Sequence, residues 1–285
     1  MSRKQKGLPQ IVLFGDSLTE WSFDDYNRGF GWALENKYHG KAEIINEGYS
    51  TPTPQYESIM LTLDFRFTSS MLRNNFRDII QRATEPSAAP TLLITIFLGA
   101  NDACLLPLRT FEENIRKFVD DILNEDRLLN TKVVLITTPP INIPESEEDE
   151  IDLDQDLGLA LAAELDSYDP KEGAAYKTYM SKKKFAEKTM EIATSYEGTS
   201  RIVGLDLWKA LIDAALRDQM RLDAADAYDD EKLPGCGLKG AKAFKQGYFS
   251  DGLHFEGLAY DVLTAGLLDV VLVKWPELAP ERVET

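Results

Sequence analysis

Histidine and cysteine are scarce in this sequence, and long apolar runs are missing. The 285 residues include only two cysteines, Cys104 and Cys236, which are too few for a disulfide framework. The charged N-terminal segment is not followed by the apolar core of a signal peptide. The longest apolar stretches, near residues 92–98 and 267–273, are much shorter than the roughly 20 residues of a membrane-spanning helix. We therefore expect a cytoplasmic protein without a membrane span.

Basic residues are outnumbered by acidic ones. Lysine and arginine together number 31 against 48 aspartates and glutamates, which gives a formal net charge of −17. Such a surface repels phosphate backbones and anionic lipid head groups, so nucleic acid is not an expected partner. The hydrophobic content of 44% is enough for a full core in one large domain or two small ones. We expect a single domain over residues 1–285, and the composition leaves the oligomeric state open.

Short β-branched runs alternate with segments of helical spacing. The runs typical of buried strands in a parallel sheet are Gln10–Phe14, Ala42–Asn46, Thr91–Leu98, Lys132–Thr137 and Arg201–Leu205. Helical spacing of apolar residues predicts a helix over Thr110–Asn124, with Thr110 as its N-cap, and an apolar final helix over Leu258–Val273. The pattern predicts an α/β fold, a three-layer α/β/α sandwich with a five-stranded parallel sheet.

Two acidic segments interrupt this pattern, and we interpret them as insertions. Pro144–Pro170 contains the run ESEEDE, and Asp218–Gly247 contains the run DDE. Such runs are more often solvated surface or partly disordered chain than functional elements. Because the first insertion follows the carboxyl end of the fourth expected strand, we expect part of it to overhang the pocket at that edge of the sheet and to limit the size of the molecules that enter it.

The first expected strand ends in FGDS, which presents Ser17 at the carboxyl edge of the sheet, where open α/β sheets bind ligands. A serine hydroxyl is a weak nucleophile until a base accepts its proton. Histidine is the usual base near neutral pH, and the chain contains only His39 and His254. His39 is expected in the last turn of a helix, where a cation suits the helix dipole, so a structural role is favoured for it. His254 is the candidate base.

Asp251 precedes His254 by three residues in the turn-rich segment SDGLHFEG. Its carboxylate can accept the second ring N–H of the histidine, fix the tautomer and stabilise the imidazolium that forms when Ser17 loses its proton. Taken alone, the pair is equally consistent with a polar turn in which Asp251 caps a backbone group. Combined with the placed serine, it predicts a catalytic triad of Ser17, His254 and Asp251.

Two further strand ends supply candidate hydrogen-bond donors for an oxyanion. Gly48 follows the second expected strand, and its N–H can approach a ligand closely because glycine has no side chain. Asn101 follows the third expected strand and offers a neutral side-chain amide. Each is equally consistent with an ordinary turn, and Asn101 with Asp102 also with a helix cap. Cys104, shortly after Asn101, is expected to be a small buried hydrophobe rather than a reactive thiol.

These blocks resemble the consensus of the GDSL/SGNH hydrolases. GDSL at residues 15–18, a glycine after the second strand, GAND at residues 99–102 and DGLH at residues 251–254 occur in the order typical of that family. Within it, the chain most resembles the isoamyl acetate-hydrolysing esterases, through FGDSLTE, LGAND, LDLW and SDGLH. The resemblance implies an SGNH hydrolase fold of flavodoxin-like type and an oxyanion hole made by the Ser17 and Gly48 N–H groups and the Asn101 side chain. It implies no metal and no organic cofactor.

One block departs from the family pattern. Relatives of this type often carry NRGFSGYNT after the second strand, where this chain has NEGYSTPTP. Gly48 is retained, Glu47 replaces the arginine, and two prolines stiffen the stretch that follows. We expect this change to affect the shape and charge of the acyl pocket more than the mechanism.

The residues and the resemblance together predict a serine esterase that hydrolyses small neutral carboxylic esters with short acyl chains through an acyl-Ser17 intermediate. Neutral small-molecule substrates suit the acidic surface. The same triad also suits a lipid esterase, a thioesterase or an acyltransferase, because family resemblance does not determine the leaving group or the acceptor. The alternative outside the enzymes is an acidic interaction module that binds a basic partner. The intact Ser17, Asp251 and His254 argue against that alternative.

Overall fold

A five-stranded parallel sheet with the strand order β2-β1-β3-β4-β5 forms the centre of the computed structural model, which describes residues 7–50, 66–144 and 170–284. The strands are β1 (Gln10–Gly15), β2 (Glu43–Gly48), β3 (Thr91–Phe97), β4 (Lys132–Ile136) and β5 (Ile202–Leu205). Their β-branched and apolar residues suit a sheet that is covered on both faces. The predicted α/β fold and its five-stranded parallel sheet are confirmed.

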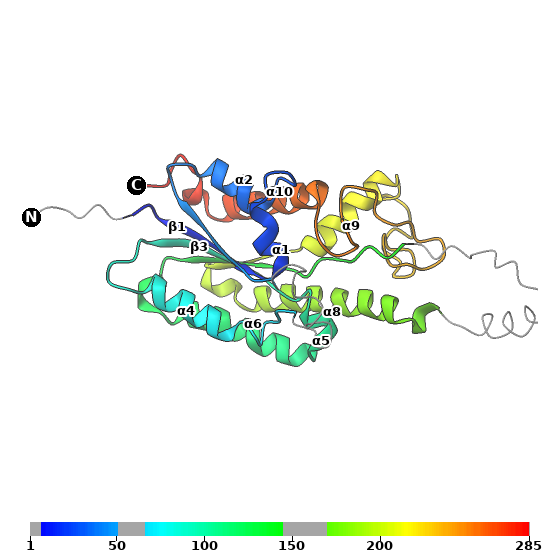
Figure 1. The fold of residues 1–285 in the computed structure, drawn as a ribbon, viewed down its shortest axis with the longest axis horizontal. Helices are drawn as coiled ribbons and strands as arrows, with labels where there is room; N and C mark the ends of the chain where they lie inside the picture. Colours follow the sequence, from blue (N-terminus) through cyan, green and yellow to red (C-terminus); the bar gives the residue numbers. More distant parts are fainter. Residues whose placement is uncertain (1–6, 51–65, 145–169, 285) are drawn as a thin grey trace, which may run out of the picture.

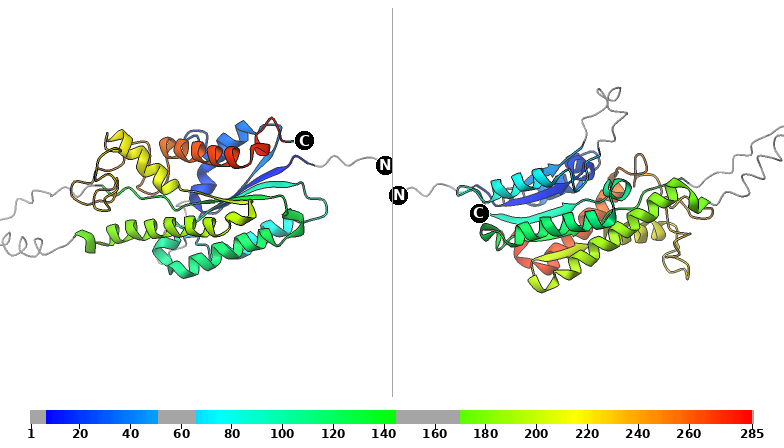
Figure 2. Two further views of the ribbon diagram at one scale, coloured as in Figure 1. Left: turned by 180° about the vertical axis from the view of Figure 1, so that it is seen from behind. Right: turned by 90° about the horizontal axis from the view of Figure 1, so that it is seen from below.

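Helices cover both faces of the sheet and complete the three layers seen in Figures 1 and 2. The α-helices are α1 (Ser17–Glu20), α2 (Phe30–Lys37), α4 (Arg73–Ala83), α5 (Asp102–Leu105), α6 (Leu108–Leu123), α8 (Ala174–Ser195), α9 (Leu207–Asp218) and α10 (Gly257–Lys274). Short 3₁₀ turns are η1 (Trp21–Phe23), η3 (Asp126–Leu128), η4 (Pro170–Glu172), η5 (Glu197–Thr199) and η6 (Pro276–Leu278). Within the described part of the chain, no helix combines the length and the apolarity that crossing a membrane requires.

Alternate residues of each strand point into opposite layers, as the strand period requires. In β1, Ile11 and Leu13 pack with residues of α2, α9 and α10. Val12 and Phe14 point the other way and pack with residues of α4, α6 and α8. All four β1 side chains are almost fully buried, so the central strand holds both layers together.

The parallel register brings the carboxyl ends of three strands to one place. Gly15 at the end of β1 pairs with Gly48 at the end of β2 and with Phe97 at the end of β3. The chain leaves all three strands at the same edge of the sheet, so the segments that follow them meet there.

Most element boundaries lie within two residues of those expected, but the predicted N-cap of α6 is wrong. The helix begins at Leu108 after Pro107, so Thr110 lies inside it. Leu106 is extended, as is usual for the residue before a proline, and the helix starts directly after the proline ring. The final helix is confirmed, since α10 covers the expected range with one more residue at each end.

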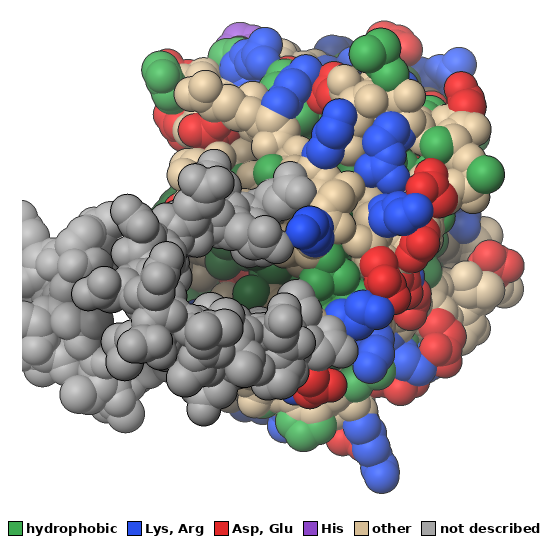
Figure 3. Space-filling view, turned by 90° about the vertical axis from the view of Figure 1, so that its right-hand side faces the viewer, with side chains coloured by type: hydrophobic (Ala, Val, Ile, Leu, Met, Phe, Trp, Pro, Cys, Tyr) green, Lys and Arg blue, Asp and Glu red, His purple; other side chains and the backbone are tan. Residues whose placement is uncertain are grey.

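The segment between α9 and the turn before α10 is irregular, and its two halves differ. Asp229 and Glu231 in its acidic run are exposed. Further along, Leu233, Cys236 and Phe244 are buried in the core beside α9 and α10. Figure 3 shows the face at this end, where lysine and arginine side chains lie beside aspartates and glutamates. The acidic run of the first expected insertion, and the overhang expected of it, lie outside the described residues.

Candidate active site

Ser17 is the first residue of α1, at the point where the chain leaves β1. The preceding residue, Asp16, is the N-cap of this helix, and its Oδ1 accepts a hydrogen bond from the Leu18 N–H at 3.1 Å. The cap fixes a sharp turn between strand and helix. As a result, the Ser17 side chain is presented at the carboxyl edge of the sheet, where the sequence placed the candidate nucleophile.

The Ser17 hydroxyl lies against His254, although the two residues are 237 positions apart. Ser17 Oγ and His254 Nε2 are separated by 3.1 Å, and His254 Nδ1 lies 2.6 Å from Asp251 Oδ2. These contacts assign the tautomer of His254 with its proton on Nδ1. In this tautomer the ring donates to Asp251 and accepts from Ser17. The structure thus brings the three candidate triad residues into one hydrogen-bonded series.

Asp251 is held by the turn that precedes α10. Its Oδ1 accepts the backbone N–H groups of Leu253 at 2.9 Å and of His254 at 2.8 Å. Burial raises the pKa of the Asp251 carboxyl, but hydrogen bonds from the His254 ring and from these two N–H groups outweigh burial and leave the pKa below its usual value. Asp251 is therefore ionised at neutral pH and can stabilise a positive charge on the imidazole.

Trp21 stacks on His254, a contact that the sequence analysis did not foresee. The two ring centroids are 4.1 Å apart with an angle of 35° between the planes. Trp21 lies in η1, directly after α1, and is 41% exposed. The indole restricts the orientation of the imidazole that faces Ser17. No motif signals this contact, because it joins two segments that are distant in the chain.

Asn101 reaches the same edge from the loop after β3. Gly99 in this loop has a φ of 116°, which favours glycine, and a Cβ there would lie 2.1 Å from Thr138 Oγ1. The turn brings Asn101 Nδ2 to the carbonyl oxygen of Phe67 at 3.0 Å. That bond uses one of the two amide hydrogens and leaves the other as a donor. The side chain makes no capping bond to α5, so the simple helix-cap interpretation does not describe it.

Gly48 closes β2 and packs against the backbone of α1. A Cβ on Gly48 would lie 2.1 Å from the Glu20 nitrogen, so this close approach requires glycine. Its N–H donates to Asn46 Oδ1 at 2.9 Å. The N–H can serve an oxyanion only after it changes partner, and its predicted role stays a prediction. In the family pattern NRGFSG the second glycine falls on Thr51, which lies outside the described residues.

A buried lysine on α8 supports the loop that carries Asn101. Lys182 is 2% exposed, and its Nζ donates to the carbonyl oxygen of Ala100 at 2.5 Å. Burial lowers the pKa of Lys182, and the nearby carboxylates of Asp16 and Asp102 oppose this shift. Both carboxyls are themselves buried, which raises their pKa, to about 7 for Asp16, while the charge of Lys182 opposes the rise. The only sequence signal of this cluster is a lysine among the buried positions of α8.

Asp102 anchors the backbone that holds Asn101. Its Oδ1 accepts the Ser69 N–H at 3.0 Å and also the Ser69 hydroxyl. Asn114 of α6 in turn donates to Ser69 Oγ at 2.8 Å and accepts from Arg73 Nε at 2.7 Å. The network ties the segment before α4 to α6. It thereby holds Phe67, whose carbonyl oxygen accepts from the Asn101 amide, in place.

Glu47, the residue that departs from the family pattern, does not line the cleft. Its carboxylate pairs with Arg82 of α4 at 2.6 Å and accepts the Tyr49 hydroxyl at 2.7 Å. The side chain is buried, and its negative charge is neutralised by Arg82. The expected effect of Glu47 on the charge of the acyl pocket is therefore not seen in the described residues.

His39 and Cys104 both depart from expectation, and neither lines the cleft. α2 ends at Lys37, so His39 lies in the exposed turn after the helix rather than in its last turn. That turn leads into the amino end of β2, at the edge of the sheet opposite the cleft. Cys104 is exposed, because α5 is a single turn that buries Asp102 and Ala103 and leaves Cys104 outside. The expectation of a buried Cys104 is wrong.

Ser17, Asn101, Asp251 and His254 line a cleft of about 370 Å³, and Gly48 is not among its walls. Its walls are Ser17, Trp21, Tyr49, Ser50, Arg66, Phe67, Asn101, Asp251, Leu253 and His254. The part of the chain that the structure describes contains no group of three or more metal-binding side chains. What the cleft does contain is a hydroxyl, a base, an ionised acid, the amide of Asn101 and the guanidinium of Arg66.

A serine, a histidine and an aspartate in one hydrogen-bonded series at the edge of a parallel sheet is an arrangement that recurs in hydrolases on several folds. The family model of the GDSL-like lipases/acylhydrolases matches residues 11–267, and the chain belongs to this family.

Curated relatives include plant, animal and fungal proteins. A GDSL esterase/lipase of Arabidopsis thaliana is 32% identical over 142 residues, 47% of this chain and 51% of that protein. The human isoamyl acetate-hydrolyzing esterase 1 homolog is 28% identical over 141 residues, 47% of this chain and 49% of that protein. The chain thus spans about half the length of these curated relatives. The isoamyl acetate-hydrolyzing esterase of Saccharomyces cerevisiae is 24% identical over 295 residues, 96% of this chain and 91% of that protein.

Solved structures share the fold. A GDSL-like lipase from Bacteroides thetaiotaomicron has a TM-score of 0.52 and 14% identity, covering 95% of this chain and 91% of that one. A lipase/acylhydrolase from Enterococcus faecalis has a TM-score of 0.50 and 18% identity, covering 93% and 95% of the two chains. At such identities the likeness concerns the fold alone, and it confirms the predicted SGNH-type architecture.

Proposed function

We propose that this chain is a serine esterase that hydrolyses small, uncharged carboxylic esters through an acyl-Ser17 intermediate. The observation that carries the proposal is the series Ser17 Oγ, His254, Asp251, with separations of 3.1 and 2.6 Å. The serine and the histidine come from opposite ends of the chain, so a local polar turn does not account for their contact. Membership of the GDSL family and the esterases among the relatives support ester chemistry.

In the acylation step, Ser17 Oγ attacks the ester carbonyl carbon as its proton passes to His254 Nε2. The imidazolium that forms is stabilised by the ionised Asp251. When the tetrahedral intermediate collapses, the bond to the alcohol oxygen breaks and His254 returns the proton to that oxygen. A water molecule then attacks the acyl carbon while His254 accepts its proton, which passes to Ser17 Oγ as the carboxylic acid leaves.

The negative charge on the carbonyl oxygen needs donors that are already in place. The Ser17 N–H is suited to this, because an N–H in the first turn of a helix has no acceptor within the helix. The free amide hydrogen of Asn101 is the second donor, and the contact with Phe67 fixes its direction. Gly48 would add a third donor once its N–H leaves Asn46.

Activity on p-nitrophenyl esters from acetate to laurate tests the proposal. We expect the highest kcat/KM at short acyl chains, because the cleft formed by the described residues is only about 370 Å³. Ser17→Ala should lower kcat by about 10⁶, the scale seen when a triad serine is removed. Equal activity of this variant and the wild type would refute the nucleophile, and a maximum at long chains would favour a lipid esterase instead.

A further inference from the structure

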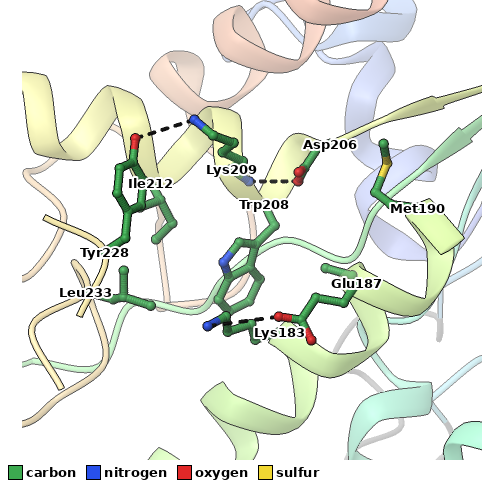
Figure 4. Close-up of a pocket in the computed structure, with 10 residues that line it drawn as sticks. Lys183, Glu187, Met190, Asp206, Trp208, Lys209, Ile212, Tyr228 and Leu233 are labelled. Carbon is green, nitrogen blue, oxygen red and sulfur yellow. Dashed lines mark hydrogen bonds and ion pairs between the residues drawn. The ribbon is translucent and has the colours of Figure 1, made fainter. Parts of the chain in front are cut away.

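A second cavity, of about 380 Å³, lies beyond β5 and shares no residue with the catalytic cleft. It opens between α8, α9 and the irregular segment after α9, as Figure 4 shows. Its walls are Lys183, Ala186, Glu187, Met190, Asp206, Trp208, Lys209, Ile212, Tyr228 and Leu233. In the sheet, β3 and β4 separate this edge from β1, the strand that leads to Ser17.

The inner wall of the cavity is apolar and firmly packed. Ala186, Ile212 and Leu233 are each no more than 3% exposed. Trp208 is 7% exposed, and its backbone N–H donates to Thr137 Oγ1 at 2.9 Å. Its indole packs edge-on against Tyr179, with 5.1 Å between the ring centroids. The position of the indole is therefore set by the fold.

The indole N–H of Trp208 is a donor without an acceptor among the described residues. Figure 4 shows its nitrogen turned into the space between Ile212, Tyr228 and Leu233. Although Trp208 as a whole is largely buried, its indole nitrogen is not among the buried unpaired side-chain atoms of the described residues, so it stays accessible from the cavity. A donor that faces an apolar cavity can bind an acceptor there with little competition from water. An oxygen of a bound molecule would satisfy this one.

The rim of the cavity carries charges, but each cation is already paired. Lys183 binds Asp230 and lies 4.0 Å from Glu187. Lys209 pairs with Asp213 at 2.6 Å within α9. The irregular segment is tied to α8 by Lys183 and Asp230, and to α9 by the Tyr228 hydroxyl, which donates to Asp213 at 2.7 Å. An ionic ligand would have to displace one of these partners, whereas an uncharged ligand would not.

Asp206 lies at the start of α9, and its carboxylate is already engaged there. Its Oδ1 accepts the Lys209 N–H at 2.9 Å as an N-cap. Burial raises the pKa of the Asp206 carboxyl, partly opposed by this N–H and by the charge of Lys209. A low-polarity site of this kind favours an uncharged occupant.

We propose that this cavity is a binding site for an uncharged, mostly apolar small molecule whose one hydrogen-bond acceptor, a ketone or ester oxygen, is received by the indole N–H of Trp208. Pockets of this size, with apolar walls and a single well-placed polar group, are typical small-molecule sites. The site does not depend on the chemistry at Ser17, so it stands or falls separately from the esterase proposal.

The test uses Prodan, an uncharged fluorescent ketone, titrated into the full chain with Ser17→Ala so that no reaction intervenes. We expect saturable binding to one site with a blue shift of the emission. Trp208→Phe keeps the aromatic ring but removes the donor, and it should weaken binding about three- to tenfold, as the loss of one neutral hydrogen bond does. Trp21→Ala is the matched control, since it removes a tryptophan from the catalytic cleft, and it should bind Prodan unchanged.

Displacement of Prodan by two naphthalenes separates the hydrogen bond from packing changes. In the parent protein, 2-acetylnaphthalene should compete about three- to tenfold better than 2-ethylnaphthalene, which has no acceptor. In Trp208→Phe this preference should vanish, even if the variant packs slightly differently. Absence of saturable binding, loss of binding in Trp21→Ala, or an equal ketone preference with and without the indole N–H would each overturn the proposal.

Discussion

Lys182 donates from Nζ to the carbonyl oxygen of Ala100 at 2.5 Å, one residue before Asn101. The lysine is almost fully buried and lies near the carboxyls of Asp16 and Asp102. These two aspartates flank the candidate nucleophile and the candidate oxyanion donor in sequence. One buried ammonium therefore links the two loops on which the proposed chemistry depends.

Lys182→Met should lower kcat about ten- to hundredfold while KM changes little, because a small misplacement of a catalytic group has effects of this size. Active-site titration with a p-nitrophenyl ester counts the active molecules. It therefore distinguishes a lower kcat per molecule from a smaller fraction of folded protein. Lys184→Met, at an exposed position of the same helix, is the matched control and should keep its activity. A normal kcat per titrated site in Lys182→Met would show that the lysine serves stability alone.

Asp16 should make stability depend on pH. Burial raises its pKa to about 7 in the folded protein from the ordinary value of 3.8. Between these two values the folded chain holds a proton that the unfolded chain has released, so this contribution to stability is full below about pH 4 and is lost as pH rises through about 7.

Asp16→Asn keeps the Oδ1 acceptor for the Leu18 N–H but does not titrate. The free energy of unfolding of the wild type, from urea titrations at several pH values, should therefore fall relative to the variant as pH rises from about 4 to 7. Parallel curves for the two proteins across that interval would contradict the raised pKa.

Asn101→Ala should lower kcat about 10²- to 10³-fold, the usual cost of removing one oxyanion donor. KM should change less, because the hydrogen bond strengthens only as charge develops on the carbonyl oxygen. Steady-state kinetics on p-nitrophenyl acetate measure both constants. Asn130→Ala, at an exposed position before β4, is the control. An equal loss of kcat in both variants would refute the assignment of Asn101 as an oxyanion donor.

Trp21→Ala should lower kcat/KM about three- to tenfold, in keeping with the energy of one aromatic contact. The cause is the stack of 4.1 Å that orients His254. Trp21→Phe restores an aromatic face and should recover most of the activity. If the alanine and phenylalanine variants were equally active, stacking would not be what orients the base.

Much of the fold could be predicted, because strand and helix periodicities follow directly from which side chains must be buried. The wrong predictions, the N-cap at Thr110 and the burial of Cys104, arose where one local sequence preference was overridden by another. Thr110 is a good N-cap residue, but Pro107 starts α6 earlier. Cys104 belongs to a residue type that is usually buried, yet the single turn α5 has room to bury only two of its four side chains.

The sequence by itself determined the α/β class and the short list of reactive groups. With only two histidines, His254 was almost the sole base available to Ser17, and Asp251 stood at a spacing that lets one turn join the two. The tertiary structure decided the rest, because contacts between distant segments depend on how the strands align. Only the fold set Trp21 on the imidazole, packed Gly48 against the backbone of α1, placed Lys182 under the Asn101 loop and left the Trp208 indole facing an apolar cavity.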